Sequence, residues 1–167
     1  MLARRWLTRA LLSAAILASL YLLLGDSREK RVLRVLRELA AAVSDQPGDT
    51  ERQKAERIQS AGRRHLSPAF VFFSPELGAL EGEETRELLG QAPGLGVSVT
   101  IDQSDVRFHE NGRARASLLV ELVHRPSGEE RREWRNAEAV LTERAGAYRL
   151  ERLDVSAPIE REPEPRP

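Results

Sequence analysis

The feature that most constrains the fold is a pair of alternating apolar runs joined by one tight turn, in the segment RFHENGRARASLLVELV at residues 107–123. A two-residue turn at Asn111-Gly112 would put Phe108 opposite Arg115 and Val106 opposite Ser117, so that apolar side chains of one strand face polar side chains of the other. A three-residue loop over residues 110–112 instead sets Phe108 opposite Ala114 and gathers the apolar side chains on one face. Because a slip of one residue moves a whole face out of the core, the sequence predicts this loop, with Gly112 at positive φ.

Residues 97–155 as a whole predict four antiparallel strands joined by short turns. The apolar residues change parity between Ile101 and Val106, so an extra residue must lie near residues 103–105, as in a β-bulge. A second change of parity before Leu153 predicts another bulge in the last strand. Without that bulge, the polar residues on either side of Leu153 would face inward.

Helical and strand patterns also precede this region. Two amphipathic helices, a short buried strand and a short helix are expected at residues 26–44, 51–66, 69–73 and 82–91. Each long helix begins with a capping box, formed by Asp26 and Glu29 in the first and by Thr50 and Gln53 in the second. The sequence therefore predicts helices first and a meander of strands afterwards.

The N-terminus carries a basic tail, residues 1–9, followed by an uncharged apolar stretch at residues 10–25. This pattern is typical of a cleaved signal peptide or of an uncleaved membrane anchor. We favour the anchor, because bulky residues end the apolar stretch where a cleavage site needs small ones. The sequence thus predicts one transmembrane helix and a single-pass protein of the inner (cytoplasmic) membrane.

Arginines on both sides of this stretch compete to set its orientation. We predict that the N-terminus lies inside, because a folded domain can cross the membrane despite its charges. The domain at residues 26–156 is then periplasmic or otherwise extracytoplasmic. Residues 157–167 are rich in proline and charge, and they predict a disordered tail.

Composition narrows the classes of function. Cysteine is absent, which excludes disulfides, thiolate catalysis and cysteine metal sites. Lys and Arg equal Asp and Glu in number, and from residue 26 onward the acidic groups are in excess. A nucleic-acid-binding surface needs a concentrated positive field, so the sequence predicts no nucleic-acid partner.

Two further stretches of the sequence are RRHLSPAFVFFSPELGALEGEETRELLG, with Gly82 and Glu84 in a G-x-E pattern, and GAYRLERLDV, with Tyr148 near its start. Both resemble the nuclear transport factor two-like superfamily, which includes polyketide-cyclase-like (SnoaL-like) proteins. The first is similar to the family's helix end, first strand, loop and third-helix start. The second resembles the family's last strand, with Tyr148 in the place of a tryptophan. The resemblance implies an α+β fold: a cone-shaped, curved antiparallel sheet wrapped around helices. It also implies a cavity open at one end and dimerisation through the outer sheet face.

Enzymes of this family use a carboxylate and oxyanion donors such as tyrosine inside the cone. This chain has two tyrosines, Tyr21 in the predicted anchor and Tyr148 near the cone's rim. Ala69 stands where polyketide-cyclase-like members often carry aspartate. The histidines are too dispersed for one metal site. The sequence therefore predicts neither a family-type catalytic set nor a cofactor.

Two groups of residues are candidates for binding. Counting outward from a turn at residues 127–128 places four of them on the inner face at the cone's mouth: His124, Arg131, Glu133 and Arg135. Three others fall on the outer sheet face as a partner or dimer surface: Trp134, Leu119 and Val123. Plain ion pairing at a wet sheet end would also account for the first group.

Two functions remain open on this basis. One is a non-catalytic membrane protein whose domain binds protein partners, forms a homodimer or scaffolds an envelope assembly. The other is a binder of small apolar or amphipathic molecules, or an isomerase- or cyclase-like enzyme, that uses the cone. In the second case Arg135 and Arg131 could grip a ligand carboxylate by paired hydrogen bonds.

Overall fold

The computed structural model describes residues 28–124 and 130–160. Among these residues, no helix combines the length and the apolar composition needed to cross a membrane. The predicted anchor at residues 10–25 lies outside the described residues, as does Asp26 of the first capping box.

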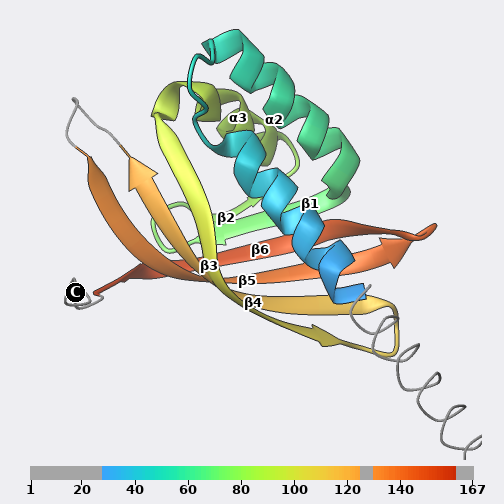
Figure 1. Ribbon diagram of the computed structural model, residues 1–167. Coiled ribbons are helices and arrows are strands. Elements are labelled where there is room, and N and C mark those ends of the chain that lie inside the picture. The colour runs from blue at the N-terminus through green and yellow to red at the C-terminus, as the bar shows by residue number, and fades with distance from the viewer. Residues whose placement is uncertain (1–27, 125–129, 161–167) are drawn as a thin grey trace, which may run out of the picture.

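Three α-helices lie on one side of a curved sheet (Figure 1). The first, α1, covers residues 28–43. It is followed by α2 (Glu51–His65), α3 (Glu83–Gln91) and a 3₁₀ turn, η1 (Ala92–Leu95). The capping box of α2 is confirmed: Thr50 Oγ1 accepts from the Gln53 backbone N–H at 3.3 Å, and Gln53 Oε1 accepts from the Thr50 N–H at 2.9 Å.

The sheet has six strands in the order β2-β1-β6-β5-β4-β3. Their bounds are Leu66–Ser74 (β1), Gly78–Glu81 (β2), Val97–Phe108 (β3), Arg113–His124 (β4), Arg131–Arg144 (β5) and Ala147–Ile159 (β6). Two features correct the sequence prediction. β2 was not expected, and β1 pairs with β6 in parallel, so the sheet is mixed rather than wholly antiparallel.

The predicted register of the β3–β4 hairpin is confirmed. Phe108 pairs with Ala114, and the His109 N–H donates to the Arg113 carbonyl at 2.9 Å, which leaves residues 110–112 as the loop. Gly112 has a φ of 75°. The apolar pattern therefore fixes the pairing, because only this register keeps the small inner residues against the helices.

Both predicted bulges are present, with small differences in position. In β3 the extra residue is Asp102, just before the expected range of 103–105. In β6 the register shifts at Glu151, so that Leu153 returns to the inner face. β6 also continues to Ile159, so the predicted boundary of the tail at residue 157 falls inside a strand. Residues 161–167 lie outside the described part.

The core lies between α1 and the inner sheet face. Ala114, Ala116 and Ala139 are wholly buried, and the absence of larger side chains there lets α1 approach the strands closely. Val32 and Leu36 provide the facing side chains from α1. The alternating alanines thus specify where the helix can lie across the sheet.

The start of α1 is bound to the tips of two hairpins. Arg31 forms an ion pair with Glu143 at 3.1 Å, and its guanidinium lies 5.5 Å from the ring centroid of Tyr148. Arg28 donates from Nε to the Tyr148 hydroxyl at 3.4 Å and stacks 4.8 Å from the centroid of Phe108. These contacts fix the start of α1 at the end of the sheet where β3 turns into β4 and β5 turns into β6 (Figure 1).

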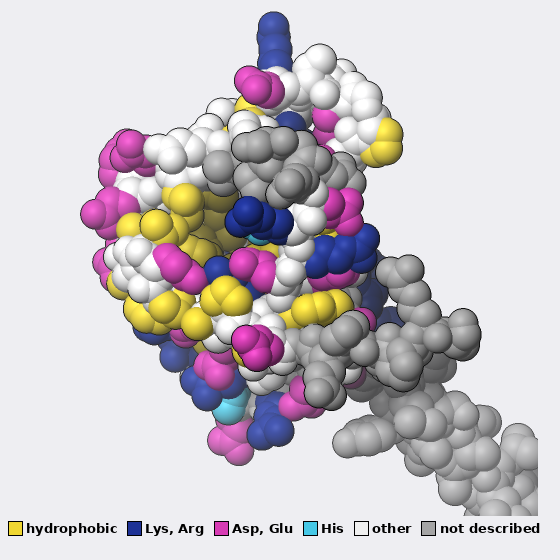
Figure 2. Space-filling model, turned by 90° about the vertical axis from the view of Figure 1, so that its left-hand side faces the viewer, with side chains coloured by type: hydrophobic (Ala, Val, Ile, Leu, Met, Phe, Trp, Pro, Cys, Tyr) yellow, Lys and Arg dark blue, Asp and Glu magenta, His cyan; other side chains and the backbone are white. Residues whose placement is uncertain are grey.

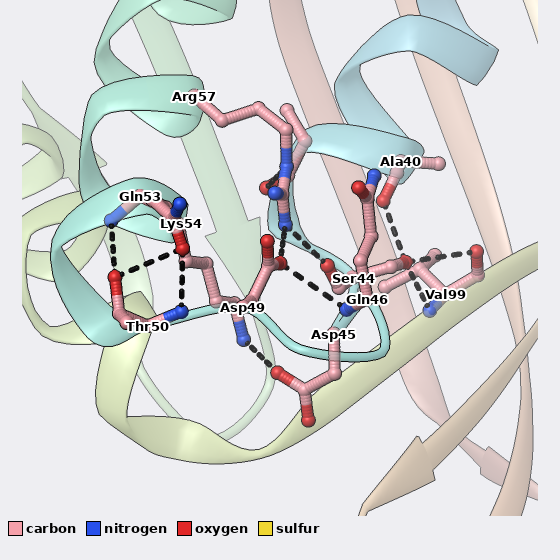
Figure 3. A network of polar contacts seen from close by, with 11 residues as sticks. Ala40, Ser44, Asp45, Gln46, Asp49, Thr50, Gln53, Lys54, Arg57 and Val99 are labelled. Carbon is pink, nitrogen blue, oxygen red and sulfur yellow. Dashed lines mark hydrogen bonds and ion pairs between the residues drawn. The ribbon is translucent and has the colours of Figure 1, made fainter.

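A polar network joins the α1–α2 turn to β3 (Figure 3). The Asp45 backbone N–H donates to the Val97 carbonyl at 2.9 Å, and its carboxylate accepts from Lys54 Nζ at 2.5 Å. Lys54 is almost fully buried, with a side chain that is 3% exposed. Asp49 pairs with Arg57 at 2.7 Å. The hydrogen bond from Arg57 is the main cause that lowers the pKa of Asp49.

Candidate functional site

The four residues predicted at the mouth of the cone come together where β4 ends and β5 begins. His124 pairs with Arg131, and two further positions along β5 carry Glu133 and Arg135. Arg131 is exposed, whereas His124, Glu133 and Arg135 are half-buried. The pairing that places them side by side is the register expected from the sequence.

Arg135 is the centre of this cluster, and its side chain is only 13% exposed. Its Nε donates to Glu133 Oε1 at 2.8 Å, and its Nη1 donates to Glu76 Oε1 at 2.7 Å. Nη1 also reaches the Ser156 carbonyl at 3.1 Å. Glu76 lies in the turn between β1 and β2. Its contact with Arg135 was not predicted, because it depends on the parallel pairing of β1 with β6, which no local sequence pattern indicates.

The pKa shifts at the mouth are consistent with this pairing. Burial by itself would lower the pKa of Arg135, but hydrogen bonds from its guanidinium to Glu133 and Glu76 raise it. The pKa of Glu76 is lowered, first by a hydrogen bond from its own backbone and then by Arg135. Two carboxylates therefore share one guanidinium. Because the guanidinium of Arg135 already donates to Glu133 and Glu76, we do not expect it to bind the carboxylate of a ligand.

A hollow opens at this end of the molecule. Figure 2 looks onto the side where β4 ends and β5 begins, and it shows a recess lined by hydrophobic side chains with acidic and basic side chains around it. Deeper in the cone, Leu36 of α1 is buried and Leu39 is partly buried against the core. Side chains of α1 thus fill part of the cone.

The outer face of the sheet carries a groove of about 600 Å³. Phe73 and Leu119 contribute apolar walls, and Phe73 is 37% exposed. Ser117, Asn136 and Ser156 contribute uncharged polar groups, and Asp105, Glu138 and Asp154 also line the groove. This face therefore offers a concave surface of mixed apolar and polar character that helices on the opposite side of the sheet do not cover.

The three residues predicted for the outer face do lie on it. Trp134 is half-buried and pairs with Glu121, and the register places it on the same side as Leu119 and Val123. Leu119 lines the groove, whereas Trp134 and Val123 lie beside it. Phe73 of β1 was not predicted for this face, because the sequence did not indicate that β1 pairs with β6.

Arginines and carboxylates alternate around the groove as ion pairs. The pairs are Arg107–Asp105 (3.0 Å), Arg115–Glu138 (3.1 Å), Arg132–Glu121 (3.5 Å) and Arg152–Asp154 (2.8 Å). Each of these four arginines therefore has a negative neighbour. Exposed pairs of this kind add little stability, but they leave the face electrically balanced.

Comparison with solved structures assigns the fold. An NTF2-like superfamily protein from Salmonella enterica superposes with a TM-score of 0.64 at 14% identity, over 84% of this chain and 97% of that one. The fold is that of the NTF2-like superfamily. No protein-family model matches the sequence, and no curated protein matches it either.

Two other similar structures illustrate the range of this fold. The association domain of C. elegans CaMKII gives a TM-score of 0.60 at 17% identity, over 79% of this chain and 97% of that one. A candidate scytalone dehydratase from Novosphingobium aromaticivorans gives 0.61 at 12% identity, over 78% and 84%. At these identities the likeness concerns the fold alone.

The structure places the residues that were considered for a family-type catalytic set, Ala69 and Tyr148, and for metal binding, His65. Ala69 is exposed on β1. Tyr148 is 3% exposed and lies under the start of α1, with Arg28 as its hydrogen-bond partner. His65 is held by Glu38 at 2.6 Å. Within residues 28–124 and 130–160, no group of three His, Cys, Asp or Glu residues is placed to bind a metal ion.

Proposed function

We propose that this NTF2-like domain is non-catalytic and works by protein association through the outer face of its sheet. The observation that carries the proposal is the groove of about 600 Å³ with the exposed Phe73 and half-buried Leu119 in its walls. Concave apolar surfaces with a polar surround are typical of sites where another protein docks.

A second copy of the chain is the occupant that the charges favour. A symmetric dimer brings a surface against itself, so a face with net charge would repel its copy. Here each arginine around the groove is already paired with a carboxylate, as in Arg115–Glu138 and Arg152–Asp154. Contact between two such faces therefore meets no net repulsion. The resemblance in fold to a CaMKII association domain agrees with a role in assembly.

Crosslinking of the chain in membranes, followed by light scattering of the extracted protein, measures whether it forms the proposed dimer. Leu119→Glu should convert dimers to monomers, because it places an unpaired charge in the centre of the contact. Ser60→Glu adds the same charge on the exposed helix side and serves as the matched control. A monomeric parent chain, or a Leu119→Glu variant that still dimerises, would refute the proposal.

We further propose that the domain is tethered to the inner membrane by residues 10–25 and lies outside the cytoplasm, where it binds envelope proteins or scaffolds their assembly. The apolar stretch and the bulky residues at its end support this placement. N-terminal sequencing of the membrane-bound protein should start at residue 1, and a mature chain that starts near residue 26 would contradict the anchor. Protease added outside spheroplasts should cleave the domain.

Small-molecule binding in the cone is the second candidate function. It is favoured by the hydrophobic hollow at the open end of the molecule (Figure 2). Because Glu76 and Glu133 already neutralise Arg135, a neutral apolar ligand fits this mouth better than an acid. An isomerase- or cyclase-like reaction in the cone would be the enzymatic version of this candidate. The candidate scytalone dehydratase supports it as a protein of similar fold that is named for an enzyme. Soaking crystals with a hydrophobic ligand library would show density in the cone if this candidate is correct.

A further inference from the structure

A second groove, of about 550 Å³, lies between α2, α3 and β1, and it shares no lining residue with the groove on the outer face. It forms where β1 and β6 lose their regular register. Leu66 pairs with Leu150 and Val71 with Arg152, so residues 67–70 of β1 lie opposite Glu151 alone. The irregular part of β1 contributes Leu66, Ser67, Pro68 and Phe70 to the lining of the groove.

The charge of this groove is of one sign. Its lining includes Arg63, Arg86 and Arg149 and no aspartate or glutamate. Arg149 is half-buried, and its Nη1 donates only to the Leu66 carbonyl, at 3.4 Å. Arg86 pairs with Glu83 at 3.2 Å, but among the described residues Arg149 forms no ion pair, and Arg63 has neither an ion pair nor a hydrogen bond. Most arginines elsewhere in the described part face a carboxylate, so this concentration of unpaired positive charge is unusual for the molecule.

The remaining walls of the groove are apolar. Ile58 and Phe70 are buried at its base, and Leu66 and Leu89 are half-buried along its sides. A volume of this size lies within the range of roughly 300–1,000 Å³ that holds small ligands. The groove thus combines apolar side chains that suit a hydrocarbon chain with arginines that suit an anion.

We propose that this groove binds an amphipathic anion, with an acyl chain against Ile58, Leu66 and Leu89 and a carboxylate or phosphate head held by Arg149 and Arg63. Guanidinium groups bind such heads through paired, charge-assisted hydrogen bonds. The unpaired Arg149 has donors available for this, unlike Arg135 at the cone's mouth, whose guanidinium is shared by two carboxylates. The site is independent of the association surface proposed above.

Photolabelling of the full-length chain in phosphatidylcholine nanodiscs tests the site. The probe is an octanoate analogue that carries a diazirine in its chain, and the labelled residues are mapped by mass spectrometry. Label should fall on peptides that contain residues 58–70 and 85–90. Unmodified octanoate should compete for it, and octanol, which has the same chain without the charge, should not. Label elsewhere, or equal competition by octanol, would overturn the proposal.

Single substitutions distinguish recognition of the anionic head from nonspecific hydrophobic binding of the probe. Arg149→Met and Arg63→Gln should each reduce groove labelling on the order of tenfold, because each removes charge-assisted hydrogen bonds to the head. The matched control is Arg64→Gln, since Arg64 is the next residue on α2 but faces Glu38 at 3.8 Å. Arg63 is exposed, so its replacement remains informative even if Arg149→Met does not fold. Labelling of Arg63→Gln equal to that of the control would refute the site.

The same experiment identifies the source of the anion. Nanodiscs that contain phosphatidylglycerol should suppress octanoate labelling if the groove takes a lipid headgroup. Labelling that is unchanged by phosphatidylglycerol but suppressed by octanoate indicates a free acid. Both results support an amphipathic anion. Labelling that neither of them suppresses would overturn it.

Discussion

The ion pair between Lys54 and Asp45 allows a test of how this fold tolerates a buried charge. The Lys54 side chain is 3% exposed and Asp45 is 41% exposed, at 2.5 Å from each other. Replacing the anion, Asp45→Asn, leaves the ammonium group buried without its counter-charge. Replacing the cation, Lys54→Met, removes the buried charge and keeps an unbranched apolar side chain of similar length. The two changes break the same contact but leave different groups behind.

The expected magnitudes differ for this reason. Removing one partner of a fully buried pair costs about 3–5 kcal/mol, whereas replacing the buried charge by an apolar side chain is often neutral. Because Asp45 is partly exposed and water screens it, we expect Asp45→Asn to lose about 2–4 kcal/mol of unfolding free energy. Lys54→Met should change it by less than about 1 kcal/mol. The backbone hydrogen bond from Asp45 to Val97 is retained in both variants.

Urea unfolding of residues 26–167, followed by circular dichroism, measures both free energies. The double variant Lys54→Met/Asp45→Asn should resemble Lys54→Met alone, because with the ammonium gone the carboxylate has nothing to compensate. If Lys54→Met is as destabilising as Asp45→Asn, the ion pair makes a net contribution to stability. The reasoning from desolvation would then be wrong.

Four further changes probe the β3–β4 hairpin, helix α3, the turn between α1 and α2, and the cone's mouth. Gly112→Val should lower the unfolding free energy by about 1–2 kcal/mol, because φ is 75° at this position; no neighbouring atom adds a clash. Gly90→Ala, in α3, should instead raise the unfolding free energy by about 0.5–1 kcal/mol. The pKa of Asp49 is depressed below 3.8, so the ionised carboxylate stabilises the folded state above that pH, and this stabilisation is lost as the pH falls through the folded-state pKa. Because Arg57→Met removes the main cause of the depressed pKa, the unfolding free energy of this variant should fall less steeply on acidification than that of the parent. Arg135→Ala should cost about 1–3 kcal/mol, since it leaves two carboxylates without their shared guanidinium.

Each of these changes can be followed by urea unfolding, and each has an outcome that contradicts it. A Gly112→Val variant as stable as the parent would show that the loop does not hold a left-handed residue. Parallel acid-unfolding curves for Arg57→Met and the parent would show that Arg57 is not what depresses the pKa of Asp49. The control for Arg135→Ala is Arg107→Ala, which breaks an exposed ion pair and should change the unfolding free energy by about 0–1 kcal/mol. Equal losses in the two variants would mean that solvent screens the charges at the mouth as much as those on the outer surface.

Local chemistry explains which parts of the fold the sequence predicts. The Thr50–Gln53 capping box and the Gly112 loop depend on residues that are neighbours in sequence, so their patterns are visible without knowledge of the rest of the chain. The inner alanines add a constraint between adjacent strands. Of the two loops considered, only the three-residue loop puts Ala114 and Ala116 opposite Phe108 and Val106 of the neighbouring strand, so that the apolar side chains share one face.

The parts that could not be predicted depend on contacts between distant segments. The parallel pairing of β1 with β6 joins Val71 to Arg152, and neither residue carries a signal for the other. This pairing brings Glu76 to Arg135 and therefore decides whether that arginine is free to bind a ligand. It also creates the register gap that opens the groove around Arg149. Both revisions of the site thus follow from one long-range contact.

The separation of the surfaces makes the proposals independently testable. Leu119 lines the groove on the outer sheet face, and Arg149 lines the groove between the helices and β1; the two linings have no residue in common. Changes at sites without shared partners have effects that add. The double variant Leu119→Glu/Arg149→Met should therefore lose dimerisation and octanoate labelling to the same extent as the two single variants. If Leu119→Glu alone also abolished labelling, the groove would depend on assembly, and the anion site would have to be sought in the dimer rather than in the single chain.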